Sequence, residues 1–212
     1  MTNRPVETTV EALCDGYDAF LIDAYGVLVH TAGAFPGAAA FLDALRARRI
    51  PFQIITNDAS RTAESCARKY RRAGLAIEAG QIITSGSLVG DYFRRNKLQE
   101  ARTVVLGPSD ARQYVDEAGG LLVEPGEDFR VLVLADESGY DFVEDVDRVL
   151  TTLLRRLDAG KPVDLVLPNP DLIYQRSEEA YGITSGAVGA MFESILERRY
   201  PNRSPRFDRL GK

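Results

Sequence analysis

The chain has 212 residues, a length that suits one large domain or two small ones. Of these residues 45% are hydrophobic and 27% are charged, which excludes a disordered, collagen-like or fibrous chain. The 26 lysine and arginine residues against 31 acidic ones give a net charge of −5, so no basic excess indicates nucleic acid or acidic lipid as a partner.

Cysteine content and hydropathy exclude further classes of protein. The two cysteines, Cys14 and Cys66, are too few for a disulfide framework, and their spacing matches no metal motif. We expect both to be buried or half-buried. The N-terminus has no apolar signal core, and no apolar run approaches the length of a membrane helix. The sequence therefore predicts a cytoplasmic protein that makes no membrane contact.

The first third of the chain alternates short apolar runs with helical patterns. Residues 19–22 form an apolar run that ends at Asp23, and residues 52–55 form a second one, so both predict buried strands. Apolar residues recur at helical spacing over 38–45 and over about 60–73. Strands that alternate with helices through short loops are typical of a parallel sheet.

The rest of the chain continues this pattern. Apolar, β-branched runs predict further strands at 82–83, 103–106, 121–123, 131–134 and 163–167. Apolar spacing predicts helices near 88–93, 111–117, 142–157 and 188–195, with an irregular stretch before the last of them. The segment 86–171 is long enough to be a second domain inserted into the first. We therefore expect a core formed by 1–85 and 172–212, with residues 86–171 inserted between the two parts.

Polar residues follow the first two predicted strands. In an open parallel sheet, ligands bind beyond the carboxyl ends of the strands. Asp23 and the triplet Thr56-Asn57-Asp58 stand at two such ends, joined by one right-handed crossover, so we expect them to face one crevice. Asp23 can act there as a nucleophile or metal ligand, or it can cap a turn. Thr56 and Asn57 can bind phosphate, or they can form a turn before a helix.

The order of several motifs carries a resemblance. The segment FLIDAYGVL at 20–28 resembles the first motif of the haloacid dehalogenase (HAD) superfamily, a hydrophobic strand followed by Asp-x-Asp-Gly-x-Leu. Further stretches resemble the NagD-like and nitrophenylphosphatase-like type IIA group in the same order: 35–42, 54–58, 168–171, 182–190 and 211–212. The resemblance covers nearly the whole chain. It implies an α/β fold, a HAD-like Rossmannoid parallel sheet core with an inserted α/β cap at 86–171.

The resemblance also implies a reaction. Asp23 would attack phosphorus, form an aspartyl-phosphate and ligate Mg²⁺. The backbone carbonyl of Tyr25 would be a second metal ligand. Lys212 would neutralise the charge of the nucleophile and the phosphate. The expected activity is that of a Mg²⁺-dependent phosphohydrolase of small phosphorylated metabolites.

The same resemblance assigns substrate-binding residues. Thr56, Asn57 and Asp58 would hold the phosphoryl group. Tyr174 lies in the region where the type IIA group contacts substrate. The cap would close over the core and select the substrate. His30, the only histidine, is expected to have a loop or surface role, and self-association of the chain stays open.

Tyr25 departs from the phosphatase pattern. HAD phosphatases usually carry a second aspartate at this position as the general acid, whereas a phenol with a pKa near 10 is a weak acid at neutral pH. Asp-x-Tyr-Gly also resembles the first motif of the L-2-haloacid dehalogenases, which expel halide without a metal. Two alternatives therefore stay open: a dehalogenase that uses Asp23 with Tyr25, and a non-catalytic phosphometabolite-binding relative.

The position of Lys212 is the second departure. The superfamily places a further acidic metal-binding motif after this lysine, and the chain stops at it. We expect an incomplete version of the catalytic core or, as the alternative, a natural protein without full metal binding. An incomplete parallel sheet would leave an open edge and an uncovered apolar face. The expected consequences are weak Mg²⁺ binding and a last helix that exposes Val188, Phe192 or Ile195 unless a partner chain covers them.

Overall fold

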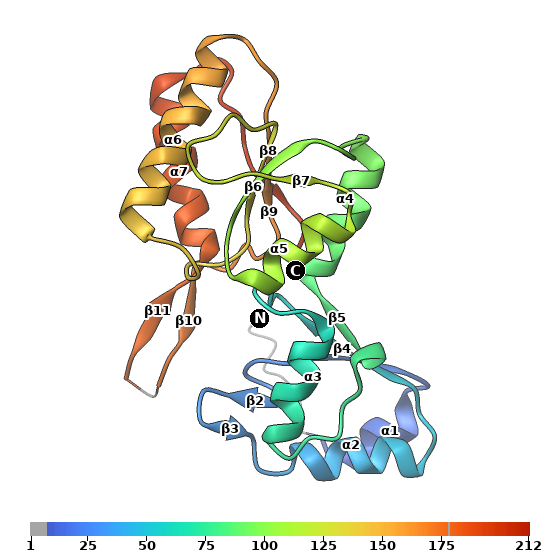
Figure 1. Ribbon diagram of the computed structural model, residues 1–212. Helices are drawn as coiled ribbons and strands as arrows, with labels where there is room; N and C mark the ends of the chain where they lie inside the picture. The colour runs from blue at the N-terminus through green and yellow to red at the C-terminus, as the bar shows by residue number, and fades with distance from the viewer. Residues whose placement is uncertain (1–7, 178) are drawn as a thin grey trace. The chain divides into compact units, whose positions relative to one another are not determined.

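A computed structural model describes residues 8–177 and 179–212 (Figure 1). The chain divides into two compact units. The first comprises the described residues up to Thr56 together with Ala63–Ile83, and the second comprises Asn57–Thr62 and Thr84–Lys212. Each unit contains a sheet with helices packed against it, and every pairing given for the strands of the two larger sheets is parallel. The predicted α/β class with parallel sheets is confirmed.

The first unit is built on a three-stranded sheet in the order β1-β4-β5. Its strands are β1 (Phe20–Asp23), β4 (Phe52–Thr56) and β5 (Ile82–Thr84), beside a small hairpin of β2 (Val29–His30) and β3 (Gly33–Ala34). The helices are α1 (Val10–Gly16), α2 (Ala38–Ala47) and α3 (Ala63–Arg72). Leu42 of α2 and Cys66 of α3 are fully buried against the sheet in one hydrophobic cluster. The apolar spacing thus predicted α2 and α3 correctly, whereas α1 was not predicted.

The opposite face of this sheet carries exposed apolar side chains on β1 and β5, while Ile55 of β4 is half-buried. Leu21 of β1 is 71% exposed and Ile83 of β5 is 43% exposed. Both strands were predicted from their apolar residues, and only alternate side chains of each strand reach the buried cluster. Apolar side chains are thus exposed on this face of the first unit, and the incompleteness of the core stays a prediction.

The second unit has a five-stranded sheet in the order β12-β9-β8-β6-β7. Its strands are β6 (Arg102–Leu106), β7 (Leu121–Leu122), β8 (Val131–Leu134), β9 (Asp164–Leu167) and β12 (Asp208–Arg209). Helices α4 (Leu88–Asn96) and α5 (Ser109–Glu117) pack on one face, and α6 (Phe142–Asp158) and α7 (Ser185–Arg199) pack on the other (Figure 1). All four residues of β8 are buried, because helices cover both faces of this central strand.

The last helix corrects one expectation. Val188 and Phe192 of α7 are 2% and 0% exposed, and they pack in the same cluster as α6 and the central strands, while Ile195 is half-buried. The prediction that this helix exposes its apolar residues was wrong, because its apolar side chains have the sheet of the second unit as their partner. The α7 helix and β12 thus pack with this sheet, and the domain boundaries near residues 86 and 171 stay predictions.

The stretch before α7 was expected to be irregular and contains an antiparallel hairpin instead. Its strands are β10 (Ile173–Gln175) and β11 (Tyr181–Ile183), with Tyr174 opposite Gly182. Each strand has only three residues, which is too short for a clear alternating pattern in the sequence. Two short 3₁₀ turns, η1 (Ala79–Gln81) and η2 (Ser85–Ser87), flank β5. Within the part of the chain that the structure describes, no helix is long and apolar enough to cross a membrane.

Candidate functional site

The carboxyl end of the first unit's sheet carries Asp23 and Thr56. The parallel register pairs Asp23 of β1 with Ile55 of β4, so Thr56 lies one residue beyond that pair on the neighbouring strand. Asp23 is half-buried and Thr56 is 9% exposed. Each strand therefore delivers one polar side chain to the same edge of the sheet, as the sequence predicted.

The loop after Asp23 is a tight turn that fixes Tyr25. The backbone N–H groups of Leu28 and Val29 donate to the carbonyl oxygen of Ala24 at 2.9 and 3.0 Å. Gly26 has a φ of 87°, which disfavours other residues there, and its N–H donates to the carbonyl of Val29 at 2.8 Å.

The phenol of Tyr25 is engaged in a hydrogen bond. Its hydroxyl lies 2.7 Å from Oγ1 of Thr31, the residue after β2. His30, which precedes Thr31, accepts a hydrogen bond at Nδ1 from the N–H of Ala32 at 3.2 Å, and its ring packs against Phe35. His30 is the last residue of β2, and these contacts place it at the edge of the loop that holds Tyr25.

Asn57 lies at the centre of a hydrogen-bond network in the second unit. Its Nδ2 donates to Oδ2 of Asp171 and to the carbonyl oxygen of Lys212, both at 2.9 Å. Its Oδ1 accepts from the backbone N–H of Lys212 at 3.0 Å. Both amide protons of the side chain are thus used, and the network brings Asn57 and Lys212, two of the predicted site residues, into direct contact.

The segment Pro168–Asp171 contains one hydrogen-bond partner of Asn57 and is itself held by two hydroxyl groups. Its sequence was recognised as part of the family pattern, but no site role was predicted for Asp171. The hydroxyl of Thr184 donates to the carbonyl of Asp171, and that of Ser185 donates to the carbonyl of Asn169 at 3.1 Å. A Cβ at Gly186 would lie 2.1 Å from the carbonyl oxygen of Asp171, so the start of α7 can approach this segment only with glycine there.

Asp58 forms a local turn. Its Oδ1 accepts from the N–H and the hydroxyl of Ser60 at 2.9 and 2.8 Å, and its Oδ2 pairs with Arg61 at 3.0 Å. The helix was predicted to begin near residue 60, but α3 begins at Ala63. The Asp58 turn explains the difference, because the side chain offers the backbone an alternative to the helix.

Tyr174 lies on the β10–β11 hairpin of the second unit. Its hydroxyl accepts a hydrogen bond from Nε of Arg176 at 3.3 Å, and the guanidinium of that arginine lies 5.8 Å from the centre of the ring. Several large apolar side chains of the hairpin segment are exposed: Leu172, Ile173, Tyr181 and Ile183. The hairpin thus presents Tyr174 on an element with an exposed apolar surface.

Acidic residues gather near the carboxyl end of β8. Burial raises the pKa of the Glu137 carboxyl, and the neighbouring charges of Asp136 and Asp58 raise it further. Glu137 was not predicted as a site residue, because a glutamate after a strand is common in loops. The charge of Asp58 therefore acts on the pKa of Glu137 within the second unit.

The donor set offers an incomplete site for a metal ion. The resemblance assigns two oxygen donors, the carboxylate of Asp23 and the backbone carbonyl of Tyr25. Among residues 8–177 and 179–212, no group of three or more histidine, cysteine, aspartate or glutamate side chains could hold a metal ion. Because Mg²⁺ takes six oxygen ligands, the described side chains do not by themselves complete a centre for it.

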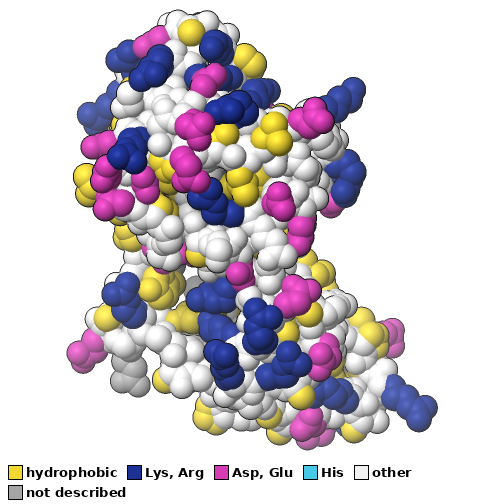
Figure 2. Space-filling view, viewed as in Figure 1, with side chains coloured by type: hydrophobic (Ala, Val, Ile, Leu, Met, Phe, Trp, Pro, Cys, Tyr) yellow, Lys and Arg dark blue, Asp and Glu magenta, His cyan; other side chains and the backbone are white. Residues whose placement is uncertain are grey.

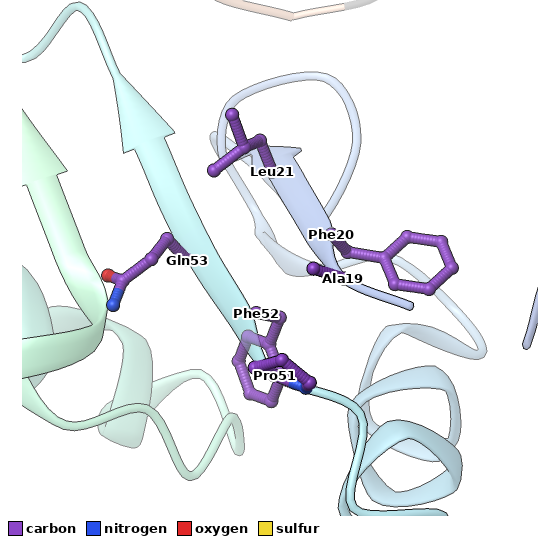
Figure 3. A pocket seen from close by; sticks show the side chains of 6 residues that line it. All are labelled: Ala19, Phe20, Leu21, Pro51, Phe52 and Gln53. Carbon is purple, nitrogen blue, oxygen red and sulfur yellow. The ribbon is translucent and has the colours of Figure 1, made fainter. Parts of the chain in front are cut away.

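A separate apolar pocket lies on the first unit's sheet. Its volume is about 180 Å³, and Figure 3 shows the side chains that line it: Ala19, Phe20, Leu21, Pro51, Phe52 and Gln53. These residues lie at the amino ends of β1 and β4, whereas Asp23 lies at the carboxyl end of β1. The pocket therefore contributes no group to the Asp23 site.

Basic side chains of the first unit gather over α3 in Figure 2. The exposed basic residues of this helix are Arg68, Lys69, Arg71 and Arg72. Elsewhere on the same view acidic and basic side chains are interspersed. The last turn of a helix favours such cations, because its dipole places partial negative charge there.

Comparison with known proteins identifies relatives along most of the chain. A family model described as haloacid dehalogenase-like hydrolase matches residues 20–120. The dihydroxyacetone phosphatase of Corynebacterium glutamicum is 26% identical over 174 residues, which are 81% of this chain and 62% of that protein. The ribonucleotide monophosphatase NagD of Escherichia coli is 30% identical over 112 residues, which are 53% of this chain and 44% of that protein. The chain thus spans about half to three fifths of the length of these curated relatives.

Solved structures extend the comparison to the fold. A possible sugar phosphatase of the HAD superfamily from Cytophaga hutchinsonii matches with a TM-score of 0.82 and 30% identity, over 97% of this chain and 70% of that one. The glycerol phosphate phosphatase of Mycobacterium tuberculosis, solved in complex with magnesium, matches with a TM-score of 0.70 and 20% identity, over 92% of this chain and 55% of that one. The latter likeness is one of fold.

Proposed function

Since this chain belongs to the haloacid dehalogenase superfamily, in its NagD-like type IIA group, we propose that it is a phosphohydrolase acting on a small phosphorylated metabolite. The observation that carries the proposal is Asp23 at the carboxyl end of β1, with Thr56 at the same edge on the neighbouring strand. The names of the relatives, a dihydroxyacetone phosphatase and a possible sugar phosphatase, favour a phosphorylated three-carbon compound or sugar as substrate.

The proposed reaction has two steps at Asp23. A carboxylate oxygen attacks phosphorus, an O–P bond forms to the aspartate, and the bond from phosphorus to the leaving alcohol breaks. Water then cleaves the aspartyl-phosphate and releases inorganic phosphate with the free carboxylate. The leaving alcohol takes its proton from water in this scheme, because the phenol of Tyr25 is a weak acid and is bonded to Thr31.

We further propose a phosphate-binding role for Thr56 in the first unit and, separately, one for Lys212 in the second unit. The Thr56 hydroxyl is a donor at the strand end, and the Lys212 ammonium supplies positive charge for the phosphate oxygens. Asn57 contributes by binding the backbone of Lys212 on both sides of the residue, through its N–H and its carbonyl. Asp58 shapes the turn that follows Asn57, and we propose a substrate-contacting role for Tyr174 on the hairpin.

The metal and the cellular setting are also proposals. Asp23 and the carbonyl of Tyr25 would contribute two ligands to Mg²⁺, and no step above is routed through the ion because the described side chains do not complete its site. Both cysteines are free and buried, which suits the reducing cytoplasm.

The proposal is tested by a panel of phosphorylated metabolites, assayed with and without Mg²⁺ on the wild-type chain and on Asp23→Asn. We expect release of phosphate by the wild type and none by Asp23→Asn, with Asp18→Asn, an exposed aspartate on the same unit, as the matched control. Full turnover by a folded Asp23→Asn protein would remove the nucleophile. Halide release from a 2-haloacid would favour the dehalogenase instead, and phosphate binding without turnover would favour the binding relative.

A further inference from the structure

The loop Asn57–Thr62 is anchored by side chains of the second unit at both of its ends. At its start, the hydroxyl of Ser85 donates to the carbonyl oxygen of Asn57 at 2.8 Å. At its end, the N–H of Thr62 donates to Oδ2 of Asp110 at 3.2 Å. The loop also carries the Asp58 turn described above. Its backbone is therefore held by groups that lie far away in the sequence.

A third anchor is the hydroxyl of Tyr114 on α5. It donates to the carbonyl oxygen of Arg61 at 2.7 Å and lies 2.6 Å from Oγ1 of Thr84. The phenol has one proton, which it donates to the carbonyl in this hydrogen bond. The hydroxyl of Thr84 must therefore donate to the phenol oxygen. Oγ1 of Thr84 in turn accepts from the N–H of Ser87 at 3.2 Å. These groups form a continuous chain of three hydrogen bonds that ends on the loop.

The two hydroxyl groups in this series of hydrogen bonds are buried. Thr84 is 0% exposed and Tyr114 is 8% exposed, so water has little access to either hydroxyl. A Cβ at Gly86 would lie 2.2 Å from the ring of Tyr114, which shows how closely the ring is packed on η2. Hydrogen bonds in such surroundings polarise one another, and a missing partner is costly.

We propose that Tyr114 is a positioning residue for phosphate binding: its hydroxyl holds the Asn57–Thr62 loop in the conformation in which that loop supports the phosphoryl site. This inference rests on the proposed function, because Asn57 of this loop binds the backbone of Lys212, the proposed phosphate ligand. Tyr114 does not touch the substrate in this scheme. It acts through the carbonyl of Arg61.

The test uses the full chain and inorganic phosphate, the reaction product, as a competitive inhibitor. Tyr114→Phe keeps the ring on Gly86 and removes only the hydroxyl. We expect the inhibition constant of phosphate and the KM to rise about 5-fold or more, the lower end of what the loss of one buried hydrogen bond gives, with a smaller change in kcat. Amide hydrogen exchange of residues 57–62 should become faster while that of β8 is unchanged.

Tyr140→Phe is the matched control. Among the described residues, the Tyr140 hydroxyl is buried and has no hydrogen-bond partner, so its removal should leave the inhibition constant of phosphate unchanged. If Tyr114→Phe does not fold, Ser85→Ala removes the anchor at the other end of the loop with little change in volume, and it should raise the same constant.

Two outcomes would overturn the inference. In an active wild type, an unchanged phosphate inhibition constant for Tyr114→Phe and Ser85→Ala, with only a lower melting temperature, would show that the anchors are merely structural. A wild type that neither hydrolyses phosphate esters nor binds phosphate would remove the proposed function, and with it the site that Tyr114 is proposed to support. The first failure is seen in the variants and the second in the wild type.

Discussion

Tyr25 stands two residues after the proposed nucleophile, and its hydroxyl is bonded within its own loop. The partner is Thr31, 2.7 Å away, in the segment that joins β2 to β3. A phenol in this position stabilises the loop through its hydroxyl, and it is a poor proton donor at neutral pH. The side chain at residue 25 should therefore decide which leaving groups the proposed phosphohydrolase accepts.

Tyr25→Asp is predicted to raise Mg²⁺-dependent hydrolysis of an alkyl phosphate by about tenfold or more, because an alkoxide leaving group gains from a general acid. Hydrolysis of nitrophenyl phosphate should change less, since nitrophenolate leaves without protonation. Tyr25→Phe is the control and should leave the ratio of the two hydrolysis rates unchanged. Rates with the two substrates measure the effect, and an equal change in both would indicate a structural role for Tyr25.

Glu137 gives a prediction about pH. Burial and the charges of Asp136 and Asp58 raise its pKa above the usual value of 4.5. Between 4.5 and the raised pKa the folded state holds the proton more tightly than the unfolded state does, so the free energy of unfolding falls as the pH rises through that interval. Above it, the full cost of the buried charge is present.

Glu137→Gln should therefore stabilise the protein at pH 7 and have little effect at pH 4. The gain should be small, about 0.5 kcal/mol or less, because the side chain is only half-buried and solvent screens the charges. Urea unfolding at the two pH values measures it. A stabilisation of the same size at pH 4 would contradict the titration of Glu137 as its cause.

Helix α7 shows what packing adds to an element. Phe192 is fully buried, and its ring contacts that of Phe207 edge-on with the centroids 6.3 Å apart. The neighbouring Met191 is 38% exposed. Two adjacent apolar residues of one helix thus differ in the free energy that their side chains contribute, because only one of them faces the sheet.

Phe192→Ala is predicted to lower the free energy of unfolding by about 3–5 kcal/mol, from lost burial and the cavity that remains. Met191→Ala, the matched control, should lower it by about 1 kcal/mol or less, because its side chain is already partly in water. Chemical denaturation compares the two variants. Equal losses would show that Phe192 is not packed as described.

The elements that were predicted from sequence are those whose apolar residues repeat over several positions. The long α6 and the central β8 were predicted because both bury apolar side chains along their length. The hairpin of β10 and β11 was missed because each strand has three residues. The two-residue β12, Asp208–Arg209, carries no apolar pattern, and it exists because its backbone pairs with β9.

The sequence likewise predicted some residues of the candidate site and missed the contacts that connect them. Asp23, Thr56 and Asn57 could be recognised because they follow apolar strands. The contacts of Asn57 with Lys212 and Asp171 bridge 155 and 114 positions of sequence, and no local pattern reports such pairs. The anchor of Arg61 on Tyr114 was missed for the same reason, since a tyrosine on an amphipathic helix reads as an ordinary core residue.

At the scale of the whole molecule, each unit has a hydrophobic core of its own. One buried cluster lies in the first unit and includes Leu42, and two lie in the second, one of which includes Leu153. The chain passes between the units at 56/57, 62/63 and 83/84. Because the apolar contacts that stabilise each unit are formed inside it, the two units should not lose their structure in one cooperative step.

Calorimetry should therefore show two unfolding transitions. Leu42→Ala and Leu153→Ala each remove a fully buried leucine side chain, and each should cost about 2–5 kcal/mol in its own unit. Leu42→Ala should lower the temperature of one transition and Leu153→Ala that of the other, so each variant is the control for its partner. A single transition that both variants shift would mean that the two units unfold together, and that the separate cores do not set the cooperativity of the molecule.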